Sequence, residues 1–306
     1  MEKLIIIDGN AIIHRAYHAL PPMNTKEGLP TNAVYGFFSM LLKLLAELNP
    51  DYLIVCFDRA KPTFRKQLYV GYQAKRPKMS DDLVPQIEMV HSALDRSKIT
   101  HFGIDGYEAD DLIGTLAKQS GELDLETIIV TGDRDLLQLV NRRVKVLAPV
   151  LGITKMVLYD EEKVKEKYGL KPSQFIDYKA LVGDSSDNYP GVSGIGPKTA
   201  SELLNKYEDF ENLYLHISEL PEKLGTKLAQ DAEQAALAKK LATIATDAPV
   251  KLELEKVKTA DIDKKGLIEA FEELGFKSLT VRVGDNGQKT IDNKRERKKE
   301  EQLELI

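Results

Sequence analysis

The chain reads Gly106-Tyr-Glu108-Ala-Asp110-Asp111-Leu-Ile-Gly114 and, after a helical segment, Thr127-Ile-Ile-Val-Thr131-Gly-Asp133-Arg-Asp135. Three acids of the first segment fall in the first turn of a helix whose apolar side chains recur at helical spacing. The two acids of the second segment follow a β-branched run that is typical of a buried strand. Ligands of parallel-sheet proteins bind at the carboxyl ends of strands, so these carboxylates are expected to face one site.

Carboxylates held this close together repel one another, so such a cluster usually requires cations. Carboxylate oxygens suit Mg²⁺ or Mn²⁺. A simpler explanation is that helix N-termini favour Asp and Glu in general. It covers the acids of the helix but leaves the pair after the strand unexplained.

Two further apolar runs end in an aspartate. Residues 4–7 precede Asp8, and residues 52–57 precede Asp58. The alternation of strands and helices predicts an α/β fold with a mostly parallel central sheet, and three of its strands would bring acids to one edge. A capping role for Asp8 is an alternative. A haloacid-dehalogenase-type phosphatase would need a second Asp two residues later, where this chain has Asn10.

A basic stretch follows the second aspartate. Residues 59–78 contain no acid and hold these basic side chains: Arg59, Lys61, Arg65, Lys66, Lys75, Arg76 and Lys78. Phe64, Tyr69 and Tyr72 are interleaved with them. Cations for phosphates and rings for bases suit a nucleic acid, although a solvated charged loop would have the same composition. The net charge of −5 does not exclude that partner, because the clustered carboxylates account for it.

A glycine-rich stretch opens a helix in the second half of the chain: Pro190-Gly191-Val-Ser-Gly194-Ile-Gly196-Pro197-Lys198-Thr199-Ala200. Glycines before a helix N-terminus expose backbone N–H groups to an anion. A P-loop needs Lys directly after its last Gly, and here Pro197 stands there. A helix–hairpin–helix loop that holds a backbone phosphate is the preferred interpretation, and a purely structural turn is the alternative.

Three ranges organise the chain: residues 1–170 as an α/β core, 171–283 as a helical region, and 284–306 as a charged tail or linker. Asp184 and Asp187 lie three residues apart at the end of a helix in the second range. The single cysteine, Cys56, rules out a disulfide within the chain. No run resembles a signal peptide or reaches the length of a membrane span, so a cytoplasmic protein is expected.

These motifs together resemble the flap-endonuclease family, in particular the 5′-nuclease domain at the N-terminus of bacterial DNA polymerase I. The resemblance covers roughly residues 1–280, and order and spacing agree. It departs locally at Arg59-Ala60 and at Tyr189, which is usually aliphatic in the family, and neither position is a ligand. The nine carboxylates that match the family's metal ligands are Asp8, Asp58, Glu108, Asp110, Asp111, Asp133, Asp135, Asp184 and Asp187.

The resemblance implies a PIN-like core with a helical arch over the site at about residues 64–94, and a helix–hairpin–helix region after it. It implies hydrolysis of DNA flaps, 5′ ends or RNA primers with two ions, Mg²⁺ or Mn²⁺. The acids up to Asp111 would form the tighter group, and the later four would hold the second ion. Lys75 and Arg76 would contact the scissile phosphate and Tyr72 would stack on a base.

The residues that the resemblance places on DNA are Phe64, Arg65, Gly191, Gly194, Ile195, Gly196, Lys198 and Thr199, with a potassium ion possible at the hairpin. A DNA polymerase, fused or separate, would be a partner. A PIN-type ribonuclease toxin is the nearest alternative enzyme, but such domains lack the arch and the hairpin. A DNA-structure binder without catalysis is the other alternative, and a full set of acids that repel phosphate argues against it.

Overall fold

A computed structural model describes residues 1–152 and 155–284. Its centre is a six-stranded sheet with the order β3-β2-β1-β4-β5-β6. The strands are β1 (Lys3–Asp8), β2 (Tyr52–Cys56), β3 (His101–Phe102), β4 (Glu126–Val130), β5 (Val144–Leu151) and β6 (Lys155–Tyr159). The first five pair in parallel and β6 is antiparallel to β5. The predicted α/β fold with a mostly parallel sheet is therefore confirmed.

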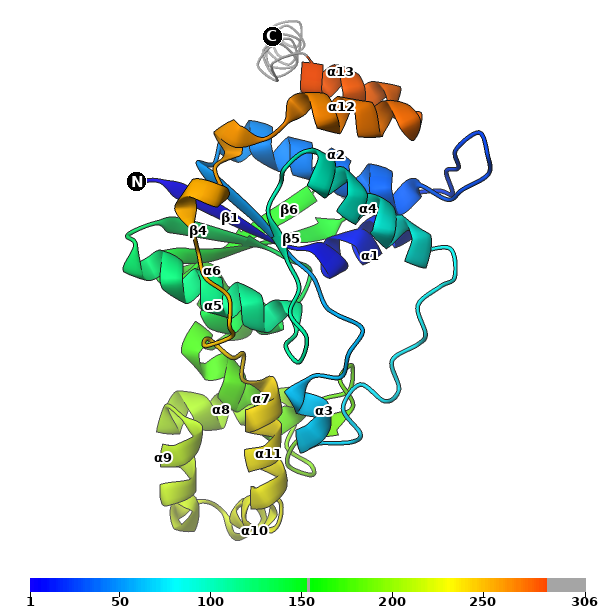
Figure 1. The fold of residues 1–306 in the computed structure, drawn as a ribbon. Helices are drawn as coiled ribbons and strands as arrows, with labels where there is room; N and C mark the ends of the chain where they lie inside the picture. Colours follow the sequence, from blue (N-terminus) through cyan, green and yellow to red (C-terminus); the bar gives the residue numbers. More distant parts are fainter. Residues whose placement is uncertain (153–154, 285–306) are drawn as a thin grey trace, which may run out of the picture.

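Both faces of the sheet are covered, which explains why its strands are continuous apolar runs. Along β1, Leu4 and Ile6 enter one apolar core, and Ile5 and Ile7 enter the other, as the two-residue period of a strand requires. One face is covered by α1 (Gly9–Ala19), α2 (Asn32–Leu48), α4 (Val84–Arg96), α12 (Lys264–Glu273) and α13 (Lys277–Gly284). The opposite face is covered by α5 (Ala109–Glu122) and α6 (Glu161–Tyr168) (Figure 1).

A helical region lies below the sheet on the side of α5 (Figure 1). It consists of α7 (Phe175–Val182), α8 (Pro197–Tyr207), α9 (Phe210–Leu215), α10 (Glu222–Gln230) and α11 (Ala232–Ala242), with a small hairpin of β7 (Gly183–Asp184) and β8 (Tyr189–Pro190). Five 3-10 turns complete the described chain: η1 (Asp135–Leu139), η2 (Pro172–Gln174), η3 (Ile217–Glu219), η4 (Leu254–Lys256) and η5 (Thr259–Asp261).

After α11 the chain returns to the sheet. The amide of Leu53 in β2 donates to the carbonyl of Val257, and the amide of Thr259 donates to that of Asp51. Helices α12 and α13 then pack on α2 and α4. The last part of the range 171–283 is helical as expected, but it lies against the α/β core and not with the other helices. The tail 284–306 falls outside the described residues from position 285 onward.

The segment expected to form a helical arch begins with the short helix α3 (Phe64–Leu68), and residues 69–83 are turns and loop before α4. Tyr72, Lys75 and Arg76 therefore lie outside any helix, so this part of the expected arch is not helical. Besides local turn bonds, this backbone makes tertiary ones: the amide of Gln73 (φ 54°) donates to the carbonyl of Asp187, and the side chain of Asn188 donates to the carbonyl of Gly71. The arch is thus anchored to the loop that carries Asp187.

Candidate active site

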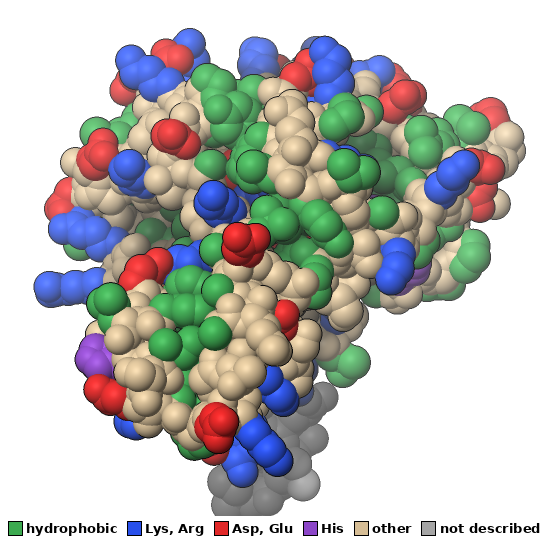
Figure 2. Space-filling model, turned by 90° about the horizontal axis from the view of Figure 1, so that it is seen from below, with side chains coloured by type: hydrophobic (Ala, Val, Ile, Leu, Met, Phe, Trp, Pro, Cys, Tyr) green, Lys and Arg blue, Asp and Glu red, His purple; other side chains and the backbone are tan. Residues whose placement is uncertain are grey.

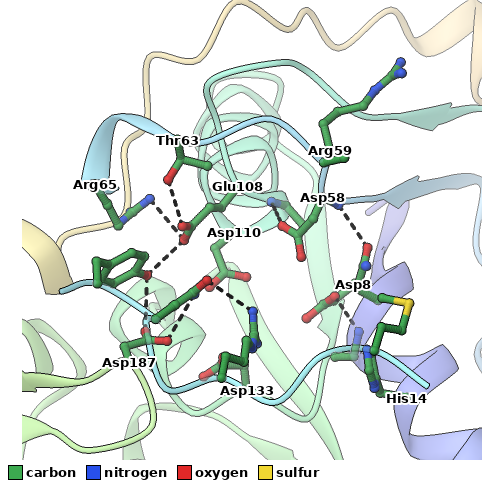
Figure 3. Close-up of a pocket in the computed structure, with 18 of the residues that line it drawn as sticks. Asp8, His14, Asp58, Arg59, Thr63, Arg65, Glu108, Asp110, Asp133 and Asp187 are labelled. Carbon is green, nitrogen blue, oxygen red and sulfur yellow. Dashed lines mark hydrogen bonds and ion pairs between the residues drawn. The ribbon is translucent and has the colours of Figure 1, made fainter. Parts of the chain in front are cut away.

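The carboxyl ends of β1, β2 and β4 open into a cavity of about 770 Å³. Seven of the predicted acids line it: Asp8, Asp58, Glu108, Asp110, Asp133, Asp135 and Asp187. The six of them that Figure 3 labels converge from the strand ends, from the start of α5 and from the loop after β7. Basic side chains of residues 59–78 line the same cavity, namely Arg59, Lys61, Arg65, Lys66, Arg76 and Lys78. The predicted meeting of the strand-end acids is confirmed.

Asp8 ends β1 and caps α1, because its carboxylate accepts from the amide of Ala11 at 3.0 Å. Its other oxygen accepts from the Thr131 hydroxyl at 2.7 Å. Burial, opposed by these two bonds and reinforced by Asp58 and Asp133, raises the pKa of Asp8 to about 7. Burial and the charges of Asp133 and Asp8 also raise the pKa of Asp110 well above its usual value. Capping alone therefore does not account for Asp8, which belongs to a set of mutually repelling acids.

Glu108 lies at the start of α5 and faces the arch. Its carboxylate accepts from the Thr63 hydroxyl at 3.0 Å and from the Tyr72 hydroxyl at 3.2 Å, and it lies 3.3 Å from the Arg65 guanidinium. Burial raises the pKa of Glu108 to about 7, although Arg65 opposes that shift. Asp58 points toward the same space and accepts from the amide of Ala109 at 2.8 Å (Figure 3). The arch is thus bonded to an acid of the cavity.

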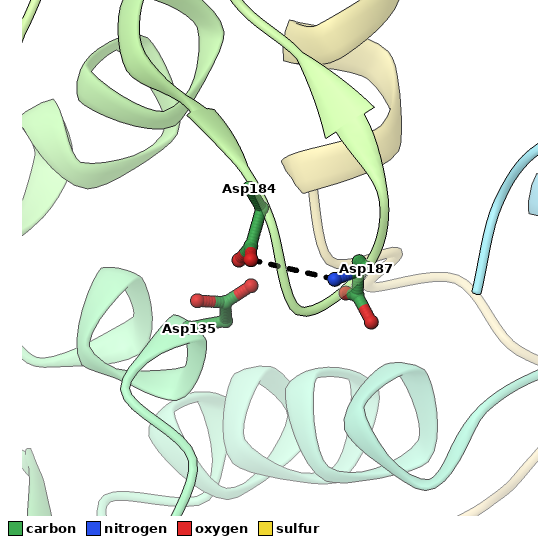
Figure 4. A group of neighbouring side chains, drawn as sticks. All are labelled: Asp135, Asp184 and Asp187. Atoms are coloured by element: carbon green, nitrogen blue, oxygen red, sulfur yellow. Dashed lines mark hydrogen bonds between the residues drawn. The ribbon is translucent and has the colours of Figure 1, made fainter. Parts of the chain in front are cut away.

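A second group consists of Asp135, Asp184 and Asp187, whose carboxylates offer oxygens within 4.8 Å of one another (Figure 4). Among the described residues it is the one group of three or more acids that is this compact. This group is therefore the more compact in space, and the prediction that the acids up to Asp111 form the tighter metal site stays a prediction. The amide of Asp187 donates to Asp184 at 3.4 Å, a bond within the loop that follows β7.

Lys179 on α7 joins two acids of this second group. Its ammonium lies 2.6 Å from Asp135 and in contact with Asp184. Burial opposes ionisation of Asp184, but Lys179 and Ser186 outweigh it and lower the pKa of Asp184. Burial and Asp133 raise the pKa of Asp135 to about 6 against the pull of Lys179. The sequence gives no sign of this contact, because no local pattern indicates which acid a lysine of an apolar helix will reach.

Asp111 does not face the cavity, although it follows Asp110 directly. It is fully buried, and each of its oxygens accepts from one guanidinium nitrogen of Arg65 at 2.8 Å. It also accepts from the amides of Glu108 at 3.0 Å and Ala245 at 2.9 Å. Its acceptor positions are thus filled by the protein itself. The expectation that Asp111 joins the other acids at the cavity is therefore wrong, because this carboxylate serves as the partner of a buried arginine.

Arg65, which was predicted to contact DNA, also lies in the interior of the protein. Its side chain is buried, and beyond Asp111 it donates to the carbonyls of Leu241 and Thr243. Phe64, the neighbouring predicted contact, is half-buried against Tyr107 with ring centroids 6.2 Å apart. Arg65 therefore fastens the base of the arch to α5 and to the end of α11, and it is not available to a phosphate.

Tyr72 is buried, and its hydroxyl reaches both Glu108 and Asp187 at 3.2 Å. Its ring lies parallel to that of Tyr189, with centroids 6.4 Å apart. In this arrangement Tyr72 connects the two acid groups, and no face is open for a base. Arg76 is exposed and lines the cavity, whereas Lys75 is exposed but lies outside its lining. Of the two predicted phosphate contacts, Arg76 is the better placed.

The predicted hairpin connects β8 to α8. Gly194 has φ 72°, and a Cβ there would lie 2.4 Å from the Lys227 ammonium. Gly191 is packed against the backbone of Gly183, where a Cβ would lie 2.4 Å from an amide nitrogen. Gly196 has open space around it and a negative φ of −99°. Conformation or packing therefore requires glycine only at Gly191 and Gly194.

Some hairpin amides are already engaged. Ser193 donates to Asp231 at 2.6 Å, and the amide of Ile195, whose side chain is buried, donates to the carbonyl of Val192. Lys198 is exposed and Thr199 is half-buried in the first turn of α8. The outer face of the helical region carries Lys and Arg interspersed with Asp and Glu (Figure 2). That face lacks the uniformly positive potential that would bind DNA by charge alone, so any DNA contact there must be made by individual residues.

A three-layer α/β core, a cavity rich in carboxylates and a basic segment across it are typical of phosphodiester hydrolases. Residues 3–169 match the family described as 5′-3′ exonuclease, N-terminal resolvase-like domain. Residues 170–265 match 5′-3′ exonuclease, C-terminal SAM fold. The chain belongs to the 5′-3′ exonuclease family.

Curated relatives agree with this assignment. DNA polymerase I of Caldicellulosiruptor bescii is 43% identical over 284 residues, which cover 92% of this chain and 33% of that protein. DNA polymerase I of Bacillus subtilis is 41% identical over 286 residues, which cover 93% of this chain and 32% of that protein. The chain thus spans about a third of the length of these relatives.

Solved structures share the fold at lower identity. The T5 D15 protein co-crystallized with metal ions has a TM-score of 0.66 and 19% identity, with 93% of this chain and 98% of that chain covered. The catalytic core of Rad2 in complex with DNA substrate has a TM-score of 0.60 and 17% identity, with 92% of each chain covered. Within residues 1–152 and 155–284, no helix combines the length and apolarity needed to cross a membrane.

Proposed function

We propose that this chain cleaves DNA at 5′ ends and flaps by metal-assisted hydrolysis of a phosphodiester, leaving a 5′-phosphate. The observation that carries this proposal is the pair of acid groups in one cavity, seven carboxylates facing one another beside Arg76 and other cations of the arch. A site built to bind phosphate alone would gain nothing from acids that repel it. The solved T5 D15 complex with DNA and metal ions supports the choice of substrate for a protein of this fold.

The residues fit divalent ions. The ligands are oxygen-only, which suits Mg²⁺ or Mn²⁺. Burial first, and neighbouring acids second, raise the pKa values of Asp8, Glu108 and Asp110, as expected for carboxylates that lack a bound cation. Asp8, Asp58, Glu108 and Asp110 would hold one ion. Asp135, Asp184 and Asp187 would hold the other, with Asp133 acting electrostatically on both groups.

When bound, the ions would supply a hydroxide nucleophile and stabilise the attacking and leaving oxygens. The chain's own residues position the substrate. Arg76 can engage a phosphate oxygen in bidentate fashion where it lines the cavity, and Lys75 adds a point charge at the rim. Tyr72 and Arg65 hold Glu108 in place from the arch side. The hairpin amides of Gly194 and Gly196 offer a sequence-independent contact to the duplex, where a potassium ion could also bind.

Cleavage of a 5′-labelled flap duplex in Mg²⁺ tests the proposal. We expect cleavage at the base of the flap, none in excess EDTA, and recovery with Mg²⁺ or Mn²⁺. Asp110→Asn should remove cleavage but keep metal-free DNA binding, since it deletes a charge that repels phosphate. A PIN-type ribonuclease would cleave single-stranded RNA in the same assay without preference for the junction, and a pure binder would retain the flap uncut.

Two wider expectations depend on the relatives. The polymerase part of the relatives, fused or separate, would be the partner that creates the flaps. The cytoplasm would be the place of action. Co-purification of this chain with a DNA polymerase activity on a gapped template tests the first, and a fluorescent fusion located by microscopy tests the second.

A further inference from the structure

The ammonium of Lys179 bridges two members of the compact acid group, Asp135 and Asp184. It lies 2.6 Å from Asp135 and in contact with Asp184, and its side chain is 19% exposed. Helix α7 ends at Val182, and Gly183 (φ 78°) turns the chain so that Asp184 comes back to the lysine. A Cβ at Gly183 would lie 2.4 Å from the backbone nitrogen of Gly191, so the turn requires glycine.

The lysine uses the oxygens that an ion would need. It contacts Asp135 through Oδ1 and Asp184 through Oδ2. The other oxygen of Asp184 accepts from the amide of Ser186 at 2.7 Å and from its hydroxyl. A divalent ion that binds Asp184 must therefore share Oδ2 with the ammonium or displace it.

We propose that Lys179 is a built-in counter-ion that holds Asp135 and Asp184 in place without metal and weakens the affinity of this position for a divalent ion. This rests on the proposed function of the compact group as the second metal position. The three ionised carboxylates carry three negative charges, and the ammonium leaves two, which one divalent ion neutralises. A nearby positive charge opposes the binding of another, so the lysine lowers metal affinity at this position.

Lys239 offers a matched control in the helical region. Its ammonium bridges Asp177 and Glu211, each at 2.7 Å, on α7 and α9. Neither acid lines the cavity or belongs to the compact group. Removing this lysine also breaks a bridge between two acids, but it leaves the candidate metal ligands unchanged.

The test measures Mn²⁺ binding without DNA at pH 8, by the electron paramagnetic resonance signal of free Mn²⁺. We expect two unequal sites in the wild type and an affinity of the weaker site raised by about tenfold or more in Lys179→Met. Lys179→Arg should stay near the wild type because it keeps the charge, and Lys239→Met should not change either site. If the Met variant does not fold, Lys179→Gln carries the same expectation.

Thermal unfolding gives a second readout that needs no activity. In EDTA, Lys179→Met should melt at a lower temperature, because its acids lose their counter-ion, and saturating Mn²⁺ should raise its Tm more than it raises that of the wild type. A folded Lys179→Met with unchanged or weaker Mn²⁺ affinity would overturn the inference. If Asp184→Asn retains both Mn²⁺ sites, the assignment of the second ion is wrong whatever Lys179 does.

Discussion

Asp110 and Asp111 are adjacent in sequence, and we expect their replacement by Asn to change stability in opposite directions when metal is absent. Asp111 accepts two charge-assisted bonds from Arg65 and two bonds from backbone amides. Its Asn variant leaves the buried guanidinium with Glu108, 3.3 Å away, as the remaining carboxylate that pairs with it. Breaking a buried ion pair from one side costs about 3–5 kcal/mol.

A loss of that size lowers Tm by about 6–20 °C, at 2–4 °C per kcal/mol for a domain of this size. Asp110 has the opposite expectation. Burial and the charges of Asp133 and Asp8 raise its pKa well above the usual value, so its ionised form destabilises the metal-free fold at pH 8. Asp110→Asn removes that charge and should raise the unfolding free energy in EDTA.

Urea denaturation followed by circular dichroism, in EDTA at pH 8, measures both effects. Asp81→Asn serves as the control, because Asp81 is an exposed acid in the loop before α4. The reasoning is refuted if Asp111→Asn is as stable as the control and has lost a Mn²⁺ site. Asp111 would then be a metal ligand, as its sequence position had suggested.

Three further outcomes are expected. Arg76→Ala should raise the single-turnover barrier by about 2–4 kcal/mol. Lys75→Ala should have a smaller effect, because of these two residues only Arg76 lines the cavity. Cleavage rates at saturating enzyme and separate binding titrations check both variants. Gly194→Val should weaken duplex binding while Gly196→Val, which meets open space and a negative φ, should not, as measured by fluorescence anisotropy. The pKa values of Asp8 and Glu108 are raised to about 7, so the metal-free fold should lose stability as pH rises from about 4 to 7. Over the same window Mg²⁺ should stabilise the fold increasingly. Tm measured with and without Mg²⁺ checks both expectations.

The sequence was sufficient for the sheet because its strands are buried on both faces and therefore are continuous apolar runs. The positions of Asp8, Asp58 and Asp133 at strand ends followed from the same pattern, since parallel strands finish at one edge. The strand β3, only two residues long, gave no such signal.

The errors concern residues whose partners are distant in sequence. Tyr72, Lys75 and Arg76 have helical spacing, but the backbone at Gly71 and Gln73 is bonded to Asn188 and Asp187, more than a hundred positions later. Arg65 belongs by composition to a basic, DNA-facing stretch, and only the fold brings Asp111 and the end of α11 around it. Nothing local distinguishes an arginine that reaches outward from one that fastens the stretch to the core.

The first turn of α5 shows why one acidic motif serves two purposes. Successive helix residues point about 100° apart, so Asp110 faces the cavity while Asp111 faces Arg65 and Ala245 behind it. Glu108 lines the cavity and also accepts hydrogen bonds from the hydroxyls of Thr63, just before the arch, and Tyr72, within it. The Tyr72 hydroxyl reaches Asp187 as well and has one proton to donate. Tyr72 and Glu108 thus bond the base of the arch both to the acids at the strand ends and to the compact acid group. A displacement of the arch must therefore alter the surroundings of both groups together.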